Sequence, residues 1–232
     1  MYELNYDFLR NYSRVHCEES KSNLNIKKMR IVKTSLLSVL IFTITSCASG
    51  YKMIEPKSIN YISKRENNGV ILEYKYGLLE KKYEKKELKK GVKLVAVKVT
   101  NNLEKDLVFG RDIRLVYEND SEIYILDNET TFKRLKQIPA SYLWYLLLTP
   151  VNFTVQKVDH TGIHESSTPI GLFIGPGLTG GNMIAAGAAN KKFKEELLKY
   201  NINGTIIKKG ETKYGLIGIE NNSFEALKLK IE

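Results

Sequence analysis

The sequence predicts a mainly β fold, a β-sandwich of short strands that is interrupted by a helical insertion. Short segments in which apolar and polar residues alternate, separated by turns rich in Asn, Asp and Gly, predict the sandwich. Residues 137–200 break this pattern with two long uncharged stretches, and they predict the helical insertion. We therefore place one domain at residues 65–232, with the insertion at about 137–200.

The first half of this domain predicts a sheet with one central strand. Apolar residues alternate with polar ones over residues 70–76, which predicts a strand with one face in water. Residues 80–90 are almost all Lys and Glu, so they form either a short charged helix or one arm of a hairpin. Residues 92–99 are mostly apolar on both faces and rich in Val, which is typical of a central strand.

Further short strands are expected on both sides of the insertion. They lie at residues 106–109, 113–117, 123–126, 204–207, 213–219 and 227–231. We expect the first and last strands of the sandwich to pair with each other despite their separation in sequence.

The insertion combines an aromatic run with a glycine-rich stretch. Residues 142–148 read Tyr-Leu-Trp-Tyr-Leu-Leu-Leu, and glycine recurs through residues 171–187, twice in the GxxxG spacing that lets helices approach closely. Residues 191–200 are amphipathic. In the first interpretation, the insertion is a helical subdomain packed on the sandwich. That packing would bury five side chains, Leu143, Trp144, Leu147, Phe193 and Leu197.

In the second interpretation, the insertion touches the surface of a membrane. Trp and Tyr side chains favour the membrane–water interface. The candidate interaction surface comprises Tyr142, Trp144, Tyr145 and Phe173. Pro150 and Pro176 interrupt the two uncharged stretches, so we expect neither stretch to span a bilayer, which needs about 20 predominantly apolar residues.

A secretory signal is predicted immediately before Cys47. A basic cluster ends at Lys33, residues 36–44 form a short uncharged apolar run, and small residues follow. Such a run is too short for a helix that stays in the membrane. The ending Ile44-Thr45-Ser46-Cys47 resembles the lipobox of bacterial lipoprotein precursors, which consists of an aliphatic residue, two small residues and cysteine.

This resemblance implies a lipid anchor. In that family the signal, here residues 29–46, is removed, the cysteine thiol receives a diacylglycerol and the new amine is acylated, for example with palmitate. Two or more acyl chains hold a protein stably in a membrane. We expect residues 47–64 to form a tether between the lipid and the domain. The expected location is the cell envelope, at the outer membrane facing the periplasm, with the inner membrane as the alternative.

Residues 1–28 fit a signal peptide poorly, because acidic residues precede the basic cluster. Met29 begins a complete basic region, Met29-Arg30-Ile31-Val32-Lys33, which predicts that translation starts there. The alternative is an unusually long leader. In both cases these residues contribute nothing to the fold.

Charge and cysteine content limit the partners and the chemistry. The formal net charge of +10 suits an anionic lipid or glycan surface of the envelope, or solubility alone. An exported lipoprotein does not routinely meet nucleic acid, so we expect none as a partner. Only Cys17 and Cys47 occur, and Cys17 precedes the expected cleavage site, so residues 48–232 offer no cysteine for a disulfide, a metal site or thiol catalysis.

One short segment contains candidate metal ligands. On a helix, His160 and His164 would share one face, and Asp159 or Glu165 would complete a site for a divalent metal. Gly162 between them indicates a solvated loop instead, where this spacing has no meaning. No Gly-x-Ser-x-Gly nucleophile elbow occurs. We therefore expect no cofactor, no bound metal and no enzymatic activity.

Two segments resemble immunoglobulin-like domains found in bacterial envelope lipoproteins. Residues 95–102 read Val-Ala-Val-Lys-Val-Thr-Asn-Asn and precede a Lys-Asp-Leu turn, like the second strand and turn of such domains. Residues 208–219 resemble a later strand. The resemblance implies an immunoglobulin-like β-sandwich and no particular activity.

Three functions remain open at this point. The first, which we expect, is a structural or protein-interaction module that presents the sandwich to another envelope protein. The second is a membrane-active accessory whose apolar, glycine-rich insertion engages lipid. The third is a small metal-binding protein or enzyme that uses His160 and His164.

Overall fold

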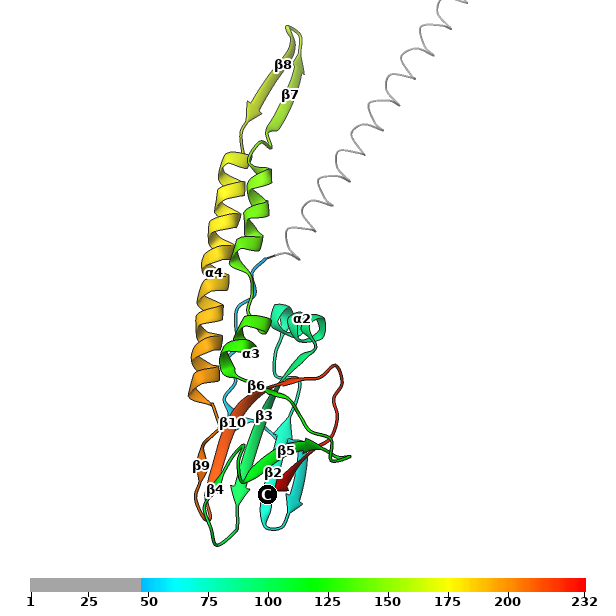
Figure 1. Ribbon diagram of the computed structural model, residues 1–232. Helices are drawn as coiled ribbons and strands as arrows, with labels where there is room; N and C mark the ends of the chain where they lie inside the picture. The colour runs from blue at the N-terminus through cyan, green and yellow to red at the C-terminus, as the bar shows by residue number, and fades with distance from the viewer. Residues whose placement is uncertain (1–46) are drawn as a thin grey trace, which may run out of the picture. The chain divides into compact units, whose positions relative to one another are not determined.

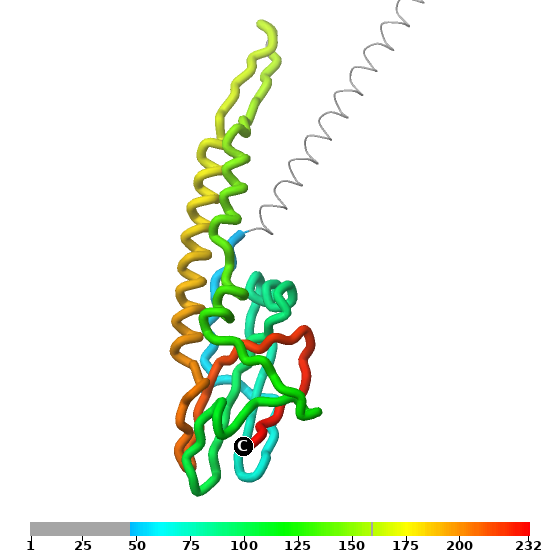
Figure 2. The backbone as a smooth tube through the Cα atoms, viewed as in Figure 1, coloured from blue at the N-terminus to red at the C-terminus, as the bar shows by residue number. Residues whose placement is uncertain are grey.

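The structure, a computed structural model, describes residues 47–232, and Ala48–Glu232 form one compact unit whose backbone can be followed in Figures 1 and 2. The predictions for residues 1–28 and 29–46, a leader and a signal peptide, lie outside the described residues. The strands are β1 (Ser63–Asn67), β2 (Val70–Lys75), β3 (Val92–Asn101), β4 (Leu107–Val108), β5 (Ile113–Tyr117), β6 (Ile125–Leu126), β7 (Phe153–Asp159), β8 (Gly162–Thr168), β9 (Ile206–Ile207), β10 (Thr212–Glu220) and β11 (Leu227–Ile231). The helices are η1 (Pro56–Ser58), α2 (Lys81–Lys90), α3 (Asn128–Leu135), η2 (Pro139–Leu148) and α4 (Gly171–Lys199).

A five-stranded antiparallel sheet, in the order β1-β2-β3-β10-β6, forms the middle layer of this unit. β3 pairs with β2 on one side and with β10 on the other, so that Val97 lies opposite both Tyr74 and Gly215. Every residue from Val92 to Val97 is buried. The prediction of a central strand at residues 92–99 is therefore confirmed.

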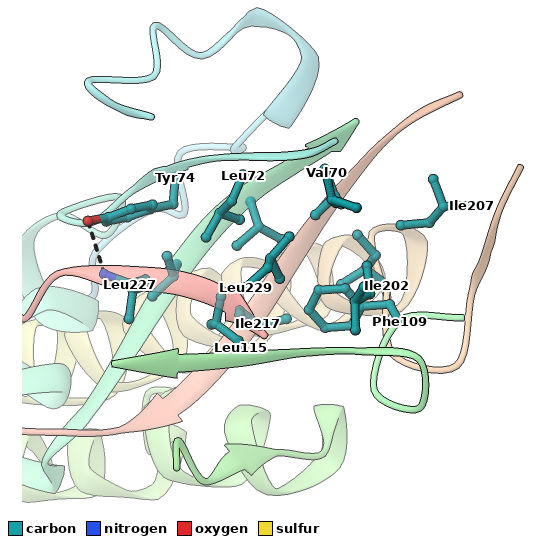
Figure 3. Packing of buried hydrophobic residues seen from close by; sticks show 14 of the residues in the cluster. Val70, Leu72, Tyr74, Phe109, Leu115, Ile202, Ile207, Ile217, Leu227 and Leu229 are labelled. Atoms are coloured by element: carbon teal, nitrogen blue, oxygen red, sulfur yellow. Dashed lines mark hydrogen bonds between the residues drawn. The ribbon is translucent and has the colours of Figure 1, made fainter. Parts of the chain in front are cut away.

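One hydrophobic cluster lies between this sheet and a second, two-stranded layer made by β5 and β11 (Figure 3). Leu72 and Tyr74 from the sheet face Leu115 and Leu229 from the second layer. The backbone N–H of Leu227 donates to the Tyr74 hydroxyl at 3.1 Å, which satisfies this polar group inside the cluster. The two sheet layers thus share a core, as a sandwich requires.

A second cluster covers the opposite face of the five-stranded sheet with helices. Because side chains alternate along β3, Leu94 and Ala96 point into this cluster while Val95 and Val97 point into the first. Helices α2, α3 and α4 supply the other side, together with the segment that follows Ala48. The expected fold is thus right in its antiparallel sheets, but the described chain is mixed α/β, because helices replace one of the expected sheet faces.

Three details correct or complete the predicted elements. Residues 80–90 take the helical alternative, and α2 ends where Gly91 adopts a left-handed conformation (φ 60°). The expected pairing of the first and last strands is wrong, since β1 pairs with β2 and β11 pairs with β5. Helix α3 was not predicted, and the Asp127 side chain caps it by accepting a hydrogen bond from the Thr130 N–H at 2.8 Å.

Candidate functional site: the helical arm

The insertion forms a structure that we call the arm, residues 139–199, comprising η2, β7, β8 and α4. Helices η2 and α4 lie side by side, and the antiparallel β7–β8 hairpin extends from their ends (Figure 1). The C-terminal part of α4 belongs to the helical layer of the domain, where Phe193 and Leu197 are fully buried. The predicted helical insertion is therefore present, and it also contains a hairpin that was not predicted.

Two glycines allow the two helices of the arm to touch. A methyl group added to Gly171 would overlap the carbonyl oxygens of Leu148 and Thr149, and one added to Gly175 would lie 2.7 Å from the Thr149 hydroxyl. The first GxxxG spacing therefore serves close packing, as expected. The glycines at 177, 180, 181 and 187 have open space around them, so the expectation of close neighbours is wrong for these positions.

Replacing Gly171 with Ala is expected to separate η2 from α4 and to destabilise the arm by about 1–3 kcal/mol, the usual cost of overpacking against atoms that cannot move aside. Faster amide hydrogen exchange in η2 would report this opening. Gly177→Ala is the matched control on the same helix, because its methyl group meets nothing within 4 Å. Alanine favours a helix over glycine by about 1 kcal/mol. Equal exchange rates in the two variants would contradict this interpretation.

The arm exposes large apolar side chains on both of its helices. Trp144 and Leu147 on η2 are 74% and 68% exposed, and Phe173 and Ile184 on α4 are 77% and 75% exposed. The expected burial of Leu143, Trp144 and Leu147 is wrong. These side chains are exposed because, among the described residues, η2 packs mainly against α4 and touches α2 at Tyr142, which leaves its other faces open. An apolar surface of this kind on a folded protein marks an interaction site.

The other two predicted surface residues, Tyr142 and Tyr145, turn inward. Tyr142 is buried and its ring stacks on that of Tyr145, with centroids 6.3 Å apart and planes 3° apart. The Tyr145 hydroxyl is buried and has no hydrogen-bond partner among the described residues. Of the four residues predicted as an interaction surface, Trp144 and Phe173 are the two that are exposed.

A buried polar network fixes the base of the arm to the domain. The Asn190 side chain accepts hydrogen bonds from the Tyr83 hydroxyl at 3.0 Å and from the Gln137 N–H at 2.9 Å, and it donates to the Gln137 carbonyl at 2.9 Å. Tyr83 lies on α2, so three separate segments meet at one amide. The low-dielectric surroundings make such fully satisfied bonds strong, and they hold the arm in one orientation.

The segment directly after Cys47 is also attached to the arm. The Ala48 N–H donates to Oδ1 of Asn182 at 2.5 Å, and Ser49 exchanges two hydrogen bonds with the Gln137 side chain, at 3.1 and 2.6 Å. Farther along, Tyr51 donates to Glu196 on α4 and its ring packs on Phe193. Figures 1 and 2 show this segment running alongside α4. The beginning of the segment expected as a tether, residues 47–64, is thus held against the arm and its base at Ala48, Ser49 and Tyr51.

Sequence reasoning missed Gln137, Asn182 and Asn190 as residues that fix the arm. Polar amides within uncharged stretches of small and apolar residues were the available sign. Their partners lie far away in sequence, so the pattern alone did not identify what they bind.

A row of lysines on α2 lies beside the start of η2. Lys82, Lys85, Lys86 and Lys89 line a hollow of about 290 Å³ whose other wall includes Ile138, Ser141 and Tyr142. Lys82 donates to the Tyr142 hydroxyl at 2.8 Å. Partial burial, followed by the charges of Lys90 and Lys89, lowers the pKa of Lys86. The row therefore concentrates positive charge, and a bound anion would reduce the repulsion between these lysines.

The candidate metal ligands lie on the hairpin. His160 is in the turn and His164 is on β8, both exposed, and the Thr161 hydroxyl lies 2.9 Å from Nε2 of His164. The expected loop is in fact a β-hairpin, in which residues four apart do not share a helical face. Among the side chains that the structure describes, which do not include that of Asp159, no group of three or more His, Cys, Asp or Glu is arranged to hold a metal ion.

Within residues 47–232, no helix has both the length and the hydropathy needed to cross a membrane. Cys47, the predicted lipidation site, is exposed. Comparisons with protein-family models, curated proteins and solved structures find no match for this chain.

Proposed function

We propose that this chain is the precursor of a lipid-anchored protein of the bacterial cell envelope, with the lipid on Cys47. The observation that carries the proposal is the position of Ile44-Thr45-Ser46-Cys47: the compact unit begins at Ala48, directly after it. A cut before Cys47 would leave the whole unit intact. The outer membrane, with the domain in the periplasm, is the proposed location.

We further propose that the anchored domain works as a structural or protein-interaction module and is not an enzyme. Its ordered attachment to the segment after Cys47 supports this role, because the domain and the arm would be held in a defined position at the membrane surface. A flexible linker would not provide such a position. Binding of a metal by His160 and His164 has little support, since both side chains are exposed on a hairpin.

The shared core of the two sheet layers supports a finer proposal for the fold, that of an immunoglobulin-like sandwich. The layer made by β5 and β11 has only two strands, and helices cover the outer face of the five-stranded sheet. On this proposal, the arm and the helices are additions to a reduced sandwich.

The lipid anchor predicts that cells fed an alkyne analogue of palmitate label the wild-type protein and fail to label Cys47→Ala. The Cys17→Ala variant is the matched control and is expected to keep the label, because Cys17 lies before the cut. Mass spectrometry of the mature N-terminus provides a second readout, with a lipid-modified Cys47 as its first residue. An unmodified Cys47 that is still joined to Ser46 would refute the proposal.

A further inference from the structure

We infer that the uncharged part of the arm lies within the interface of an anionic bilayer, with the α2 lysine row at the lipid headgroups. This inference rests on the proposed lipid anchor and deepens the proposed function by naming the partner of the arm. It takes from the anchor the choice of a membrane as that partner and the position of the lipid on Cys47.

The first argument is the composition of the exposed surface. Residues 137–156 and 166–190 contain no charged side chain, yet Trp144, Leu147 and Phe173 point away from the protein. A helix that is apolar on all sides is normally surrounded by protein or lipid. Within residues 47–232, the apolar side chains on the outer faces of η2 and α4 are exposed, so lipid is free to cover them.

The second argument is the level at which the chain after Cys47 meets the arm. The Ala48 N–H binds Asn182, and the Thr179 hydroxyl, less than one helical turn away, donates to the Tyr142 carbonyl at 3.3 Å. Three features therefore lie at the same position along the length of the arm: the attachment point of Ala48, the lysine row beside Tyr142 and the start of the uncharged surface. A lipid on Cys47 would be one residue from this position in the sequence.

The third argument is charge. Lys85, Lys86 and Lys89 form no ion pair with a carboxylate within the described part of the chain, and they line the hollow next to η2. Anionic headgroups attract lysines near a membrane surface. A protein partner would need an apolar groove for the arm and an acidic patch beside it. An anionic bilayer has an apolar interior directly next to negatively charged headgroups.

The hairpin decides how the arm lies. Lys157 and Glu165 are on β7 and β8, and the outer edges of this two-stranded sheet carry backbone groups that hydrocarbon cannot satisfy. The arm must therefore lie along the interface and not across the membrane. The apolar face of an interfacial helix is buried about 5–10 Å into the membrane, which is close to the diameter of a helix. At this depth, the exposed apolar side chains of both η2 and α4 reach apolar surroundings.

The only tryptophan of the chain, Trp144, is a built-in probe of this contact. Because residues 48–232 contain both hydrophobic clusters, this segment can be produced without Cys47 and checked by circular dichroism. Vesicles of phosphatidylcholine with phosphatidylglycerol are expected to shift its fluorescence to shorter wavelengths. Bromine near the headgroups should quench the emission more than bromine near the chain ends. Affinity should be at least about tenfold lower for phosphatidylcholine alone, because each lysine near an anionic surface contributes measurably.

Three variants test the apolar surface of the arm and the lysine row separately. Phe173→Asp, at an exposed site of the arm, is expected to weaken vesicle binding at least about tenfold, whereas Ile62→Asp, at a residue 79% exposed outside the arm, is the matched control and should bind like wild type. Lys85→Glu combined with Lys89→Glu should abolish the preference for anionic vesicles.

An unshifted Trp144 spectrum with a folded protein would overturn the inference, and so would stronger quenching from the chain ends. A spectrum that shifts with protein concentration in the absence of vesicles would also overturn it, since a second copy would then cover the arm. The labelling of Cys47 in cells is independent of these outcomes, because the segment tested here carries no anchor.

Discussion

Replacing Phe193 with Ala is expected to lower the free energy of unfolding by about 3–5 kcal/mol, a large fraction of the roughly 5–15 kcal/mol of an ordinary domain. Phe193 is 0% exposed and lies at the centre of the helical cluster. Its ring contacts those of Tyr51, Tyr83 and Phe132, with centroids 5.2, 5.3 and 6.1 Å away. These partners come from three other segments, so no single rearrangement can fill the cavity that the substitution leaves.

Urea unfolding followed by circular dichroism measures this loss. Phe173→Ala is the matched control, because it makes the same chemical change on the same helix at a side chain that is 77% exposed. Exposed substitutions usually change stability by less than about 0.5 kcal/mol. Similar unfolding midpoints for the two variants would show that α4 is not anchored through Phe193.

Glu87 is expected to make the domain less stable as the pH rises from about 4.5 to 7. Its side chain is 3% exposed, and burial raises the pKa of its carboxyl group to about 7, although the Leu94 N–H donates to it at 2.7 Å and Lys93 is near. In this window the folded state binds more protons than the unfolded state, so stability falls with increasing pH. The shift from the ordinary value of 4.5 corresponds to a loss of about 3 kcal/mol.

Glu87→Gln keeps a hydrogen-bond acceptor for Leu94 and cannot ionise, so its stability should not decline in the same way over this range. Thermal unfolding of both proteins between pH 4.5 and 8 tests the difference. Glu66→Gln, at an exposed position on β1 that does not act on Glu87, should retain the wild-type pH dependence. Parallel curves for wild type and Glu87→Gln would exclude Glu87 as the responsible group.

Sequence patterns predicted those elements whose environment is set locally. Residues 92–99 could be identified as a central strand because apolar side chains on both faces of a strand require cover on both sides. The hairpin formed by β7 and β8 gave no comparable sign, since its side chains are exposed on both faces wherever the structure describes them. Helix α3 is short, and its cap at Asp127 was the only local indication of where it begins.

The apolar run at residues 142–148 shows a different limit. Hydrophobicity predicted burial, but burial depends on how many neighbours a segment meets, and within the described residues η2 meets mainly α4. Only Tyr142, whose hydroxyl lies beside Lys82 of α2 and Gln137, is buried. A run of apolar residues is compatible with a buried core and also with an exposed interaction surface. The choice between the two therefore required the three-dimensional arrangement.

The pairing of β3 with β10 has a consequence for the order of folding. The side-chain hydroxyls of Thr100 and Thr212 are hydrogen-bonded although the two residues are 112 positions apart in the sequence. The pairing of β3 with β10 must therefore close a very long loop. The helices of the arm and the β7–β8 hairpin contain mostly local contacts, which form fast, whereas distant strand pairing is slow. We therefore expect the arm to form early and to bring β10 close to β3. In that case a weakened arm would slow the refolding of the sheet, even though the arm contributes no strand to it.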